Sequence, residues 1–329
     1  MSGRLNLLVA SLALALACPG PNDDEGWQEA FDASESGWLL SVWGAPDDLW
    51  AVGGVPDPST AIVMHRYEGE WKTVDPPAGT PLLNWVFGFG EEIFIAGQEG
   101  VVLHRVDGDF DTMTTPTDQD LWGVWGSSPT DVWAVGGNPF PGGEPTIIHY
   151  DGSAWTSVEV PELMRANVFA FFKVWGSGPN DVWVVGQRGA VVHFDGTTWT
   201  EELIGASVDM ISLWGTGPDR IAVVGGRGNG TFYTYDGSTW TEGEIPLGLP
   251  GLNGVWVDDR IHVVGEQGTI ASFDFDTRTL VEDQSIPSAL TLHAIFGDGQ
   301  RLTTVGGNLN SPVAPFVGIA RVRNMIDAD

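Results

Sequence analysis

Cysteine and positive charge are scarce in this sequence. The 329 residues include one cysteine, Cys18, and 14 lysines and arginines against 44 aspartates and glutamates, for a formal charge of -30. One thiol cannot form a disulfide within the chain, so packing must hold the fold together. The lack of basic side chains argues against a nucleic-acid partner and against direct electrostatic adhesion to anionic lipid. Because the acidic residues are spread through turns, we interpret them as a solvated surface, with weak multi-site cation binding as the alternative.

Helical periodicity is missing after the first 17 residues, and those residues have the pattern of a secretion signal. Residues 1–17 combine a basic start at Arg4 with an apolar run that is too short to span a bilayer as a mature helix. Cleavage after Ala17 would leave Cys18 as the N-terminus, and ALAC resembles a bacterial lipobox. We therefore predict an exported lipoprotein of the outer membrane, periplasm or cell surface, with residues 18–26 as anchor and tether. The alternative is an ordinary Ala-x-Ala signal with an incidental cysteine.

The sequence is rich in repeats, and Val174 to Glu201 is a typical unit. An aromatic residue leads each copy, and 9 to 11 residues later a glycine ends the next apolar run. Seven leading aromatics recur every 38 to 50 residues, at Trp43, Phe87, Trp125, Trp175, Trp214, Trp256 and Phe296. The matching glycines are Gly53, Gly97, Gly136, Gly186, Gly225, Gly265 and Gly306.

A third apolar run and a fourth follow in almost every copy, most often separated by an acidic-glycine turn such as Asp195-Gly196. Short β-branched and aromatic runs punctuated by Gly, Pro and Asp are typical of strands joined by hairpins. Four strands in each 38 to 50 residues match one propeller blade. Seven copies predict an all-β fold, a seven-bladed β-propeller of four-stranded antiparallel blades, as one domain over residues 27–323 with a tail at 324–329.

The two ends of the chain predict how the ring closes. After Gly306 the last copy has one more strand, Phe316 to Val322, and no fourth. Residues 26–31 (GWQEAF) instead resemble an isolated fourth strand, because Trp27 precedes Trp43 by a spacing found between blades elsewhere. We expect this N-terminal strand to complete the last blade and leave no open edge there.

The repeat is similar to those of two propeller families. The phrase VGQRGAVVHFDGTTWTE resembles the Asp-box (BNR-type) repeat of photosystem II assembly factor-like propellers, without the doubled glycine of that turn. The phrases VGG…HYDGSAW and FDFDTRTL resemble kelch repeats. Both resemblances imply a propeller and leave the activity open, because such scaffolds host many functions.

Enzyme chemistry known on these scaffolds finds little support here. The resemblance to Asp-box sialidases would require an arginine cluster with a Tyr/Glu pair, and the sequence has four tyrosines, all on or near third strands. Kelch-type copper oxidases need a Cys-Tyr crosslink, which a terminal Cys18 cannot supply. We expect no cofactor and a binding or assembly role, with a cell-surface glycan hydrolase or lyase as the alternative.

Metal binding is not predicted either. Four histidines occupy the same third-strand position in successive copies, which places them in different blades, too far apart for one metal ion; they are His65, His104, His149 and His193. We interpret them as structural. Residues 107–111 superficially resemble a calcium loop but coincide with a plain hairpin.

Loop lengths select one end of the propeller as the binding face. The second-to-third and blade-to-blade connections vary in length, whereas the other turns hardly do, and repeat scaffolds carry insertions on the binding face. Two rings of residues fall there. Two residues past each glycine are Val55, Glu99, Asn138, Arg188, Arg227, Gln267 and Asn308. Three residues before each leading aromatic are Leu40, Asn84, Trp122, Phe172, Ile211, Asn253 and His293.

These rings predict a funnel that binds a peptide, protein or carbohydrate. Trp122 and Phe172 would offer stacking surfaces, although packing between blades is the simpler interpretation. Arg188 and Arg227 would bind a carboxylate, beside Arg165 and Lys173 in the longest blade-to-blade connection, unless nearby acids pair with them. Candidate ligand-binding residues are Arg188, Arg227, Asn138, Gln267, Asn308, Trp122, Phe172, Asn253 and His293. We expect a monomer that reaches the membrane only through its N-terminal lipid.

Overall fold

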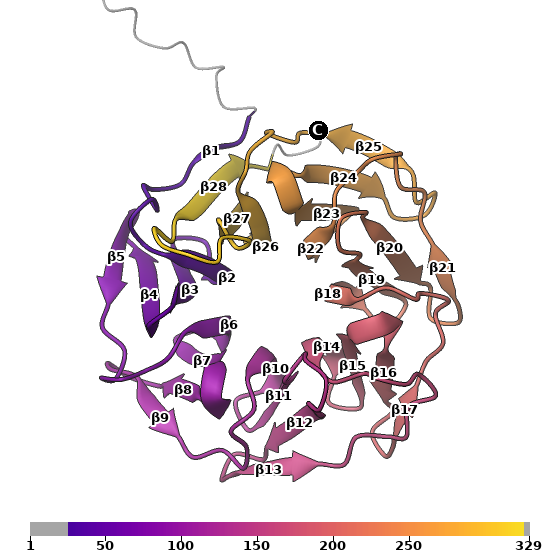
Figure 1. Cartoon of the computed structure of the whole chain (residues 1–329), viewed down its shortest axis with the longest axis horizontal. Helices are drawn as coiled ribbons and strands as arrows, with labels where there is room; N and C mark the ends of the chain where they lie inside the picture. The colour runs from indigo at the N-terminus through magenta and orange to yellow at the C-terminus, as the bar shows by residue number, and fades with distance from the viewer. Residues whose placement is uncertain (1–25, 326–329) are drawn as a thin grey trace, which may run out of the picture.

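Residues 26–325, which the computed structural model describes, form a ring of seven four-stranded antiparallel sheets (Figure 1). The innermost strands β2, β6, β10, β14, β18, β22 and β26 surround the axis. The predicted all-β, seven-bladed propeller is therefore confirmed. No described helix is long and apolar enough to cross a membrane. The predicted signal segment and Cys18 lie outside the described residues.

Each blade runs from an inner strand next to the axis to an outer strand at the rim. Blades 1 to 4 comprise β2 (Trp38–Ala45), β3 (Asp48–Pro56), β4 (Ser59–Tyr67), β5 (Glu70–Val74); β6 (Leu83–Phe89), β7 (Glu92–Gly97), β8 (Val102–Arg105), β9 (Asp111–Met113); β10 (Leu121–Ser128), β11 (Asp131–Gly137), β12 (Pro145–Tyr150), β13 (Trp155–Val158); and β14 (Phe171–Gly178), β15 (Asp181–Gly186), β16 (Val191–Phe194), β17 (Trp199–Glu201).

Blades 5 to 7 comprise β18 (Met210–Gly217), β19 (Arg220–Gly225), β20 (Thr231–Tyr235), β21 (Trp240–Glu242); β22 (Leu252–Val257), β23 (Arg260–Gly265), β24 (Ile270–Asp274), β25 (Leu280–Asp283); and β26 (Thr291–Gly297), β27 (Arg301–Gly307), β28 (Gly318–Asn324), β1 (Gln28–Glu29). Three 3-10 turns join second to third strands, at η1 (Gln98–Gly100), η2 (Gln187–Gly189) and η3 (Glu266–Gly268).

The second strand of each blade is buried on both faces. In β15, Val182, Trp183 and Val184 are each at most 1% exposed. Successive side chains of a strand point to opposite faces, so the adjacent blades must cover both sides of it. Burying each such side chain stabilises the fold by about 1.5–3 kcal/mol, which is why packing alone can hold a ring without disulfides.

The acidic-glycine turns are fixed by their carboxylates. Asp236 accepts hydrogen bonds from the backbone N–H groups of Ser238 and Thr239, at 2.9 and 2.8 Å, and Gly237 takes a φ of +87° that favours glycine. The hydroxyl of Ser238 and the two backbone donors lower the pKa of Asp236 from 3.8 to about 2. Asp151 makes the equivalent turn. These turns lie at the end of the ring opposite the variable connections.

The third-strand histidines form part of a repeated contact in the blades. His193 is paired across the strands with Trp183, and their rings stack with centroids 3.8 Å apart. Its Nε2 lies 2.6 Å from Oδ1 of Asp181, which also faces Trp183. His65, His104 and His149 repeat this arrangement of carboxylate, imidazole and aromatic ring. Each histidine therefore joins the second strand to the third within its own blade.

Closure occurs through the N-terminal segment, as predicted. Strand β1 pairs antiparallel with β28, with Gln28 opposite Val322, and becomes the outer strand of the last blade (Figure 1). Nε1 of Trp27 donates to Oε1 of Gln284 in the preceding blade at 3.0 Å. The Phe31 ring lies 4.8 Å from that of Trp71 in the first blade. The N-terminal segment thus connects the last blade to both of its neighbours.

Candidate functional site

Each inner strand contains one extra residue, and these seven residues line a single central cavity. The register between inner and second strands shifts at equivalent points, for example between Phe171 and Lys173 in blade 4. A bulge of this kind leaves one residue unpaired and re-aims its side chain. The seven bulge residues are Leu40, Asn84, Trp122, Phe172, Ile211, Asn253 and His293. They make up the second ring expected from the sequence, and all of them line a cavity of about 290 Å³.

The leading aromatics close the channel on the far side of this cavity. Trp43 of blade 1 contacts Phe87 and Phe296 of the neighbouring blades, with ring centroids 4.5 and 4.7 Å apart. It also contacts Trp214 of blade 5 across the axis, at 5.6 Å. The aromatic rings therefore fill the axis three residues along each strand from the bulges.

The cavity opens at the end that carries the variable connections. Gln98, Pro139, Arg227 and Glu266, from four second-to-third connections, line it together with the bulge residues. Six of the ten exposed large hydrophobic side chains in the described chain also lie in connections at this end: Phe140, Met164, Leu203, Val208, Leu247 and Val313. The end of the ring at which the cavity opens therefore also presents exposed apolar side chains that a partner could cover.

Trp122 and Phe172 both pack and line the cavity. Phe172 is 8% exposed and forms a cluster with Ile211, against which Trp122 packs. Nε1 of Trp122 donates to the carbonyl of Gly137 at 2.9 Å, which fixes the indole. The two side chains therefore pack between blades, as the simpler interpretation of the sequence has it. They also line the cavity, where a ligand could stack on them.

Polar bulge residues connect blades around the cavity. Nδ2 of Asn84 donates to the carbonyl of Leu121 at 2.9 Å, and Nδ2 of Asn253 contacts that of Leu292 at 3.5 Å. Within residues 26–325, Oδ1 of Asn84 is a buried acceptor without a hydrogen-bond partner. An unsatisfied buried acceptor costs free energy that a donor could recover.

His293 is uncharged at neutral pH. Burial lowers the pKa of its imidazole from 6.5 to about 4, and the charges of Lys173 and Arg227 act in the same direction. Nδ1 lies 2.6 Å from the carbonyl oxygen of Leu40, which only accepts, so Nδ1 carries the proton. Nε2 of His293 is consequently an acceptor.

Lys173 is the group that the sequence placed wrongly. It was expected in a connection, but it lies within β14, is 4% exposed and lines the cavity. Its Nζ lies 3.1 Å from the centroid of the Trp85 ring and donates to the carbonyl of Trp122 at 3.4 Å. Burial holds the pKa of the amine well below its ordinary value of 10.5. Lys173 makes no ion pair with any described residue.

Of the two arginines expected to act together, only Arg227 lines the cavity, although the backbone N–H of Arg188 and Nε of Arg227 both donate to Asp209. Arg227 lines the cavity, its Nε donates to Oδ2 of Asp209 at 3.0 Å, and its guanidinium lies 5.8 Å from the Phe172 ring. Arg188 is not among the cavity residues; its Nε donates to the carbonyl of Asn167 at 3.1 Å. The acid pairing anticipated for these arginines is present at Arg227, where the bond uses Nε alone.

The other polar residues of the first ring do not line the cavity. Asn308 supports its own loop, because Oδ1 accepts from Trp38 and Val317 and Nδ2 donates to Pro315. Gln267 is exposed in η3 with a φ of +57°. Residues that follow their glycines by the same number of positions therefore lie in different places, because the second-to-third connections differ in shape from blade to blade.

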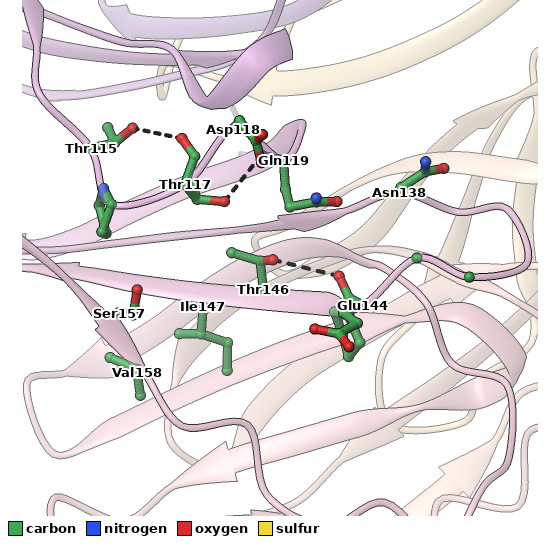
Figure 2. Close-up of a pocket in the computed structure, with 14 residues that line it drawn as sticks. Thr115, Thr117, Asp118, Gln119, Asn138, Glu144, Thr146, Ile147, Ser157 and Val158 are labelled. Carbon is green, nitrogen blue, oxygen red and sulfur yellow. Dashed lines mark hydrogen bonds between the residues drawn. The ribbon is translucent and has the colours of Figure 1, made fainter.

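Asn138 lies on a second, peripheral pocket of about 750 Å³ (Figure 2). This pocket is bounded by the connection 115–119 and by residues 142–147 in and before β12. Its threonines are already engaged: the hydroxyl of Thr115 lies 2.8 Å from the carbonyl oxygen of Gly100 and 3.2 Å from that of Thr117, and Thr146 donates to the carbonyl of Glu144 at 3.5 Å (Figure 2). We favour the smaller central cavity as the site because all seven blades contribute to it. It is also lined by Asn84, whose buried Oδ1 has no hydrogen-bond partner among the described residues, and by Lys173, whose buried amine has no ion pair there.

Comparison with known proteins supports the fold. No family model matches this sequence, and no curated protein does. Among solved structures, YCF48 from Cyanidioschyzon merolae is similar over 90% of this chain and 98% of its own, with 16% identity and a TM-score of 0.65. A structure of YCF48 bound to D1 peptide covers 78% of this chain and 95% of its own, with 15% identity and a TM-score of 0.55. The WD40 propeller domain of Doa1 covers 90% and 97%, with 9% identity and a TM-score of 0.66.

At these identities the comparisons establish a seven-bladed propeller whose structural neighbours include the photosystem II assembly factor YCF48 and a WD40 domain. The fold alone does not determine what is bound.

Proposed function

We propose that this protein is a binding or assembly scaffold that holds a segment of a protein partner in its central cavity. The observation that carries the proposal is the convergence of seven bulge side chains, one from each blade, on one cavity. Single extra residues that re-aim side chains are typical of functional sites. The exposed apolar side chains at the same end would contact the body of the partner. YCF48, which has a similar fold, has been solved with a bound peptide, and this favours a peptide over other ligands.

The alternative of a glycan hydrolase is not favoured. Glycosidases use two carboxylates placed on either side of the scissile bond. Of the described residues that line the cavity, Glu266 alone carries a carboxylate. A two-carboxylate mechanism would need a second acid that this cavity does not provide.

The arginines give a direct test of where the partner binds. We expect Arg227→Ala to reduce partner binding about tenfold, equivalent to about 1.4 kcal/mol, because a cavity-lining guanidinium is lost. Arg188→Ala should change binding by less than about twofold, since its side chain holds the 163–168 connection instead. The measurement is capture of partners from an extract of the source cells on immobilised variants, with quantification by mass spectrometry.

The opposite end supplies the control for this experiment. Asn180→Ala and Asp219→Ala alter turns between inner and second strands, at the end away from the cavity. Capture should be unaffected by both. If capture is lost with these two variants and retained with Arg227→Ala, the partner binds at the end opposite the cavity, and the proposed binding face is wrong.

We further propose that the scaffold is exported and anchored by lipid at Cys18. The basic start, apolar run and ALAC sequence support this, and a diacylglyceryl cysteine would supply membrane affinity that an acidic domain lacks. Cys18→Ser should therefore move the protein from the membrane fraction to the soluble fraction. Unchanged fractionation, or a mature mass without lipid, would contradict the anchor.

A further inference from the structure

The strongest unexplained group in the molecule is the amine of Lys173. The sequence contains two lysines, Lys72 and Lys173. Lys72 is exposed and pairs with Glu70 at 3.3 Å, as is usual for a lysine. Lys173 is buried at the centre of the ring, and its two close neighbours, the Trp85 ring and the Trp122 carbonyl, carry no charge. A buried charge without a counter-charge is costly, so proteins rarely keep one that has no use.

The surrounding strands leave room for Lys173 to reach across the cavity. Trp85, Gly123 and Lys173 occupy the same position, two residues before the leading aromatic, in blades 2, 3 and 4. Gly123 has no side chain, and a Cβ there would lie 3.0 Å from Cα of Lys173. The lysine stem therefore passes blade 3 and places Nζ on the Trp85 face, where the ring attracts the charged form of the amine.

The other charged or titratable groups that line the cavity favour an anion. They are Arg227, His293 and, from η3, Glu266. Arg227 is already paired with Asp209 through Nε. The positive charges of Lys173 and Arg227 help to lower the pKa of His293. Two basic side chains and a neutral imidazole therefore share one small cavity with a single carboxylate, in a protein whose formal charge is -30.

We propose that the central cavity is a carboxylate site, in which Nζ of Lys173 pairs with a carboxylate of the bound segment, either a C-terminus or an acidic side chain. The inference rests on the proposed function for its biological partner. A carboxylate supplies the counter-charge that Lys173 lacks and accepts its remaining N–H group. Arg227 at the opening of the cavity can donate to the same group or to its neighbour. Trp122 and Phe172 provide apolar walls for the residue that carries the carboxylate.

Binding should also be coupled to proton uptake. An anion beside Lys173 and His293 favours the charged form of each, so it raises both pKa values above those of the empty cavity. The complex should therefore take up protons as it forms, in the pH range where the free protein has released them. Ordinary surface binding of a carboxylate by an arginine takes up none.

Benzoate and benzamide provide a matched pair of probes. They have nearly the same shape, and only benzoate carries a charge. In protein labelled with ¹³C at Cε of lysine, the chain gives two lysine signals, and Lys72 is the internal control. We expect benzoate to shift the Lys173 signal and raise its titration midpoint, leave Lys72 unmoved, and bind at least about tenfold more tightly than benzamide. Calorimetry in buffers of different ionisation enthalpy should show proton uptake.

Two variants complete the test. Lys173→Met keeps the length of the apolar stem and should abolish the preference for benzoate and most of the proton uptake. Arg188→Ala should leave both unchanged. Equal binding of the two probes, no benzoate binding at about 10 mM, or an intact preference in Lys173→Met would overturn the proposal. If Lys173→Met still captures the partner, the proposed scaffold function stands and only the carboxylate site is wrong.

Discussion

Each inner strand carries one extra residue, and the side chains of all seven extra residues line the cavity. The sequence predicted these residues correctly as a ring, because they share a fixed offset from the leading aromatics. It did not predict the position of Lys173, which was assigned with Arg165 to the longest blade-to-blade connection. Its register two residues before Trp175 was the signal that places it in the inner strand.

The cost of burying Lys173 can be measured through its pH dependence. The unfolded chain holds a proton on this amine up to about pH 10.5, whereas the folded chain releases it at lower pH. Folding therefore expels a proton, and the parent becomes more stable as pH rises toward 10.5. We expect Lys173→Met to be more stable than the parent at pH 7, with an advantage that shrinks toward pH 10.5, in denaturant unfolding at several pH values.

Lys72→Met is the control for that comparison. Lys72 is exposed, so its removal should change stability little. If Lys173→Met is less stable than the parent at pH 7, contacts with Trp85 and Trp122 outweigh the burial cost, and the charge does not need a ligand.

The blades were predictable as elements because each repeats the same local chemistry. Apolar second strands, acidic-glycine turns and third-strand histidines recur at fixed spacing, and all take equivalent positions in the structure. The connections were less predictable. Arg188 lies in a 3-10 turn with a φ of +57°, whereas Asn138 begins a longer loop, so the same offset from a glycine leads to different places. Repetition therefore determines the strands, and loop length determines where the first ring of residues lies.

The closing strand is short enough to remove cleanly. Deletion of residues 26–31 removes β1 together with the contacts of Trp27 and Phe31, and exposes the edge of β28. Two partly buried aromatic side chains contribute about 3 kcal/mol, so we expect the Tm to fall by roughly 5–10 °C with increased aggregation. Thermal melting with light scattering measures both effects. Deletion of residues 20–25 is the length-matched control and should melt like the parent; equal melting of the 26–31 deletion would show that closure does not depend on β1.

Negative charge dominates the molecule as a whole but not the lining of its central cavity. A formal charge of -30 keeps the chain soluble and repels anions at long range, while two basic groups line the cavity. Moderate salt should therefore help an acidic segment to approach before it weakens the local ion pair. From loop lengths, the sequence predicts the variable end as the binding face. The exposed apolar residues there could not be recognised in advance, because exposure depends on how each connection packs.

The central claim is that a protein partner enters the cavity from the variable end. The most direct test places the photoreactive residue p-benzoylphenylalanine at Leu309, which lines the cavity, or at Asn180, which is exposed at the opposite end. After irradiation in an extract of the source cells, mass spectrometry identifies the crosslinked peptides. We predict that position 309 crosslinks to one defined segment of a partner, that this crosslink is reduced in the Arg227→Ala background, and that position 180 gives none. Crosslinking of the same partner from position 180 and not from position 309 would show that the partner binds at the end opposite the cavity.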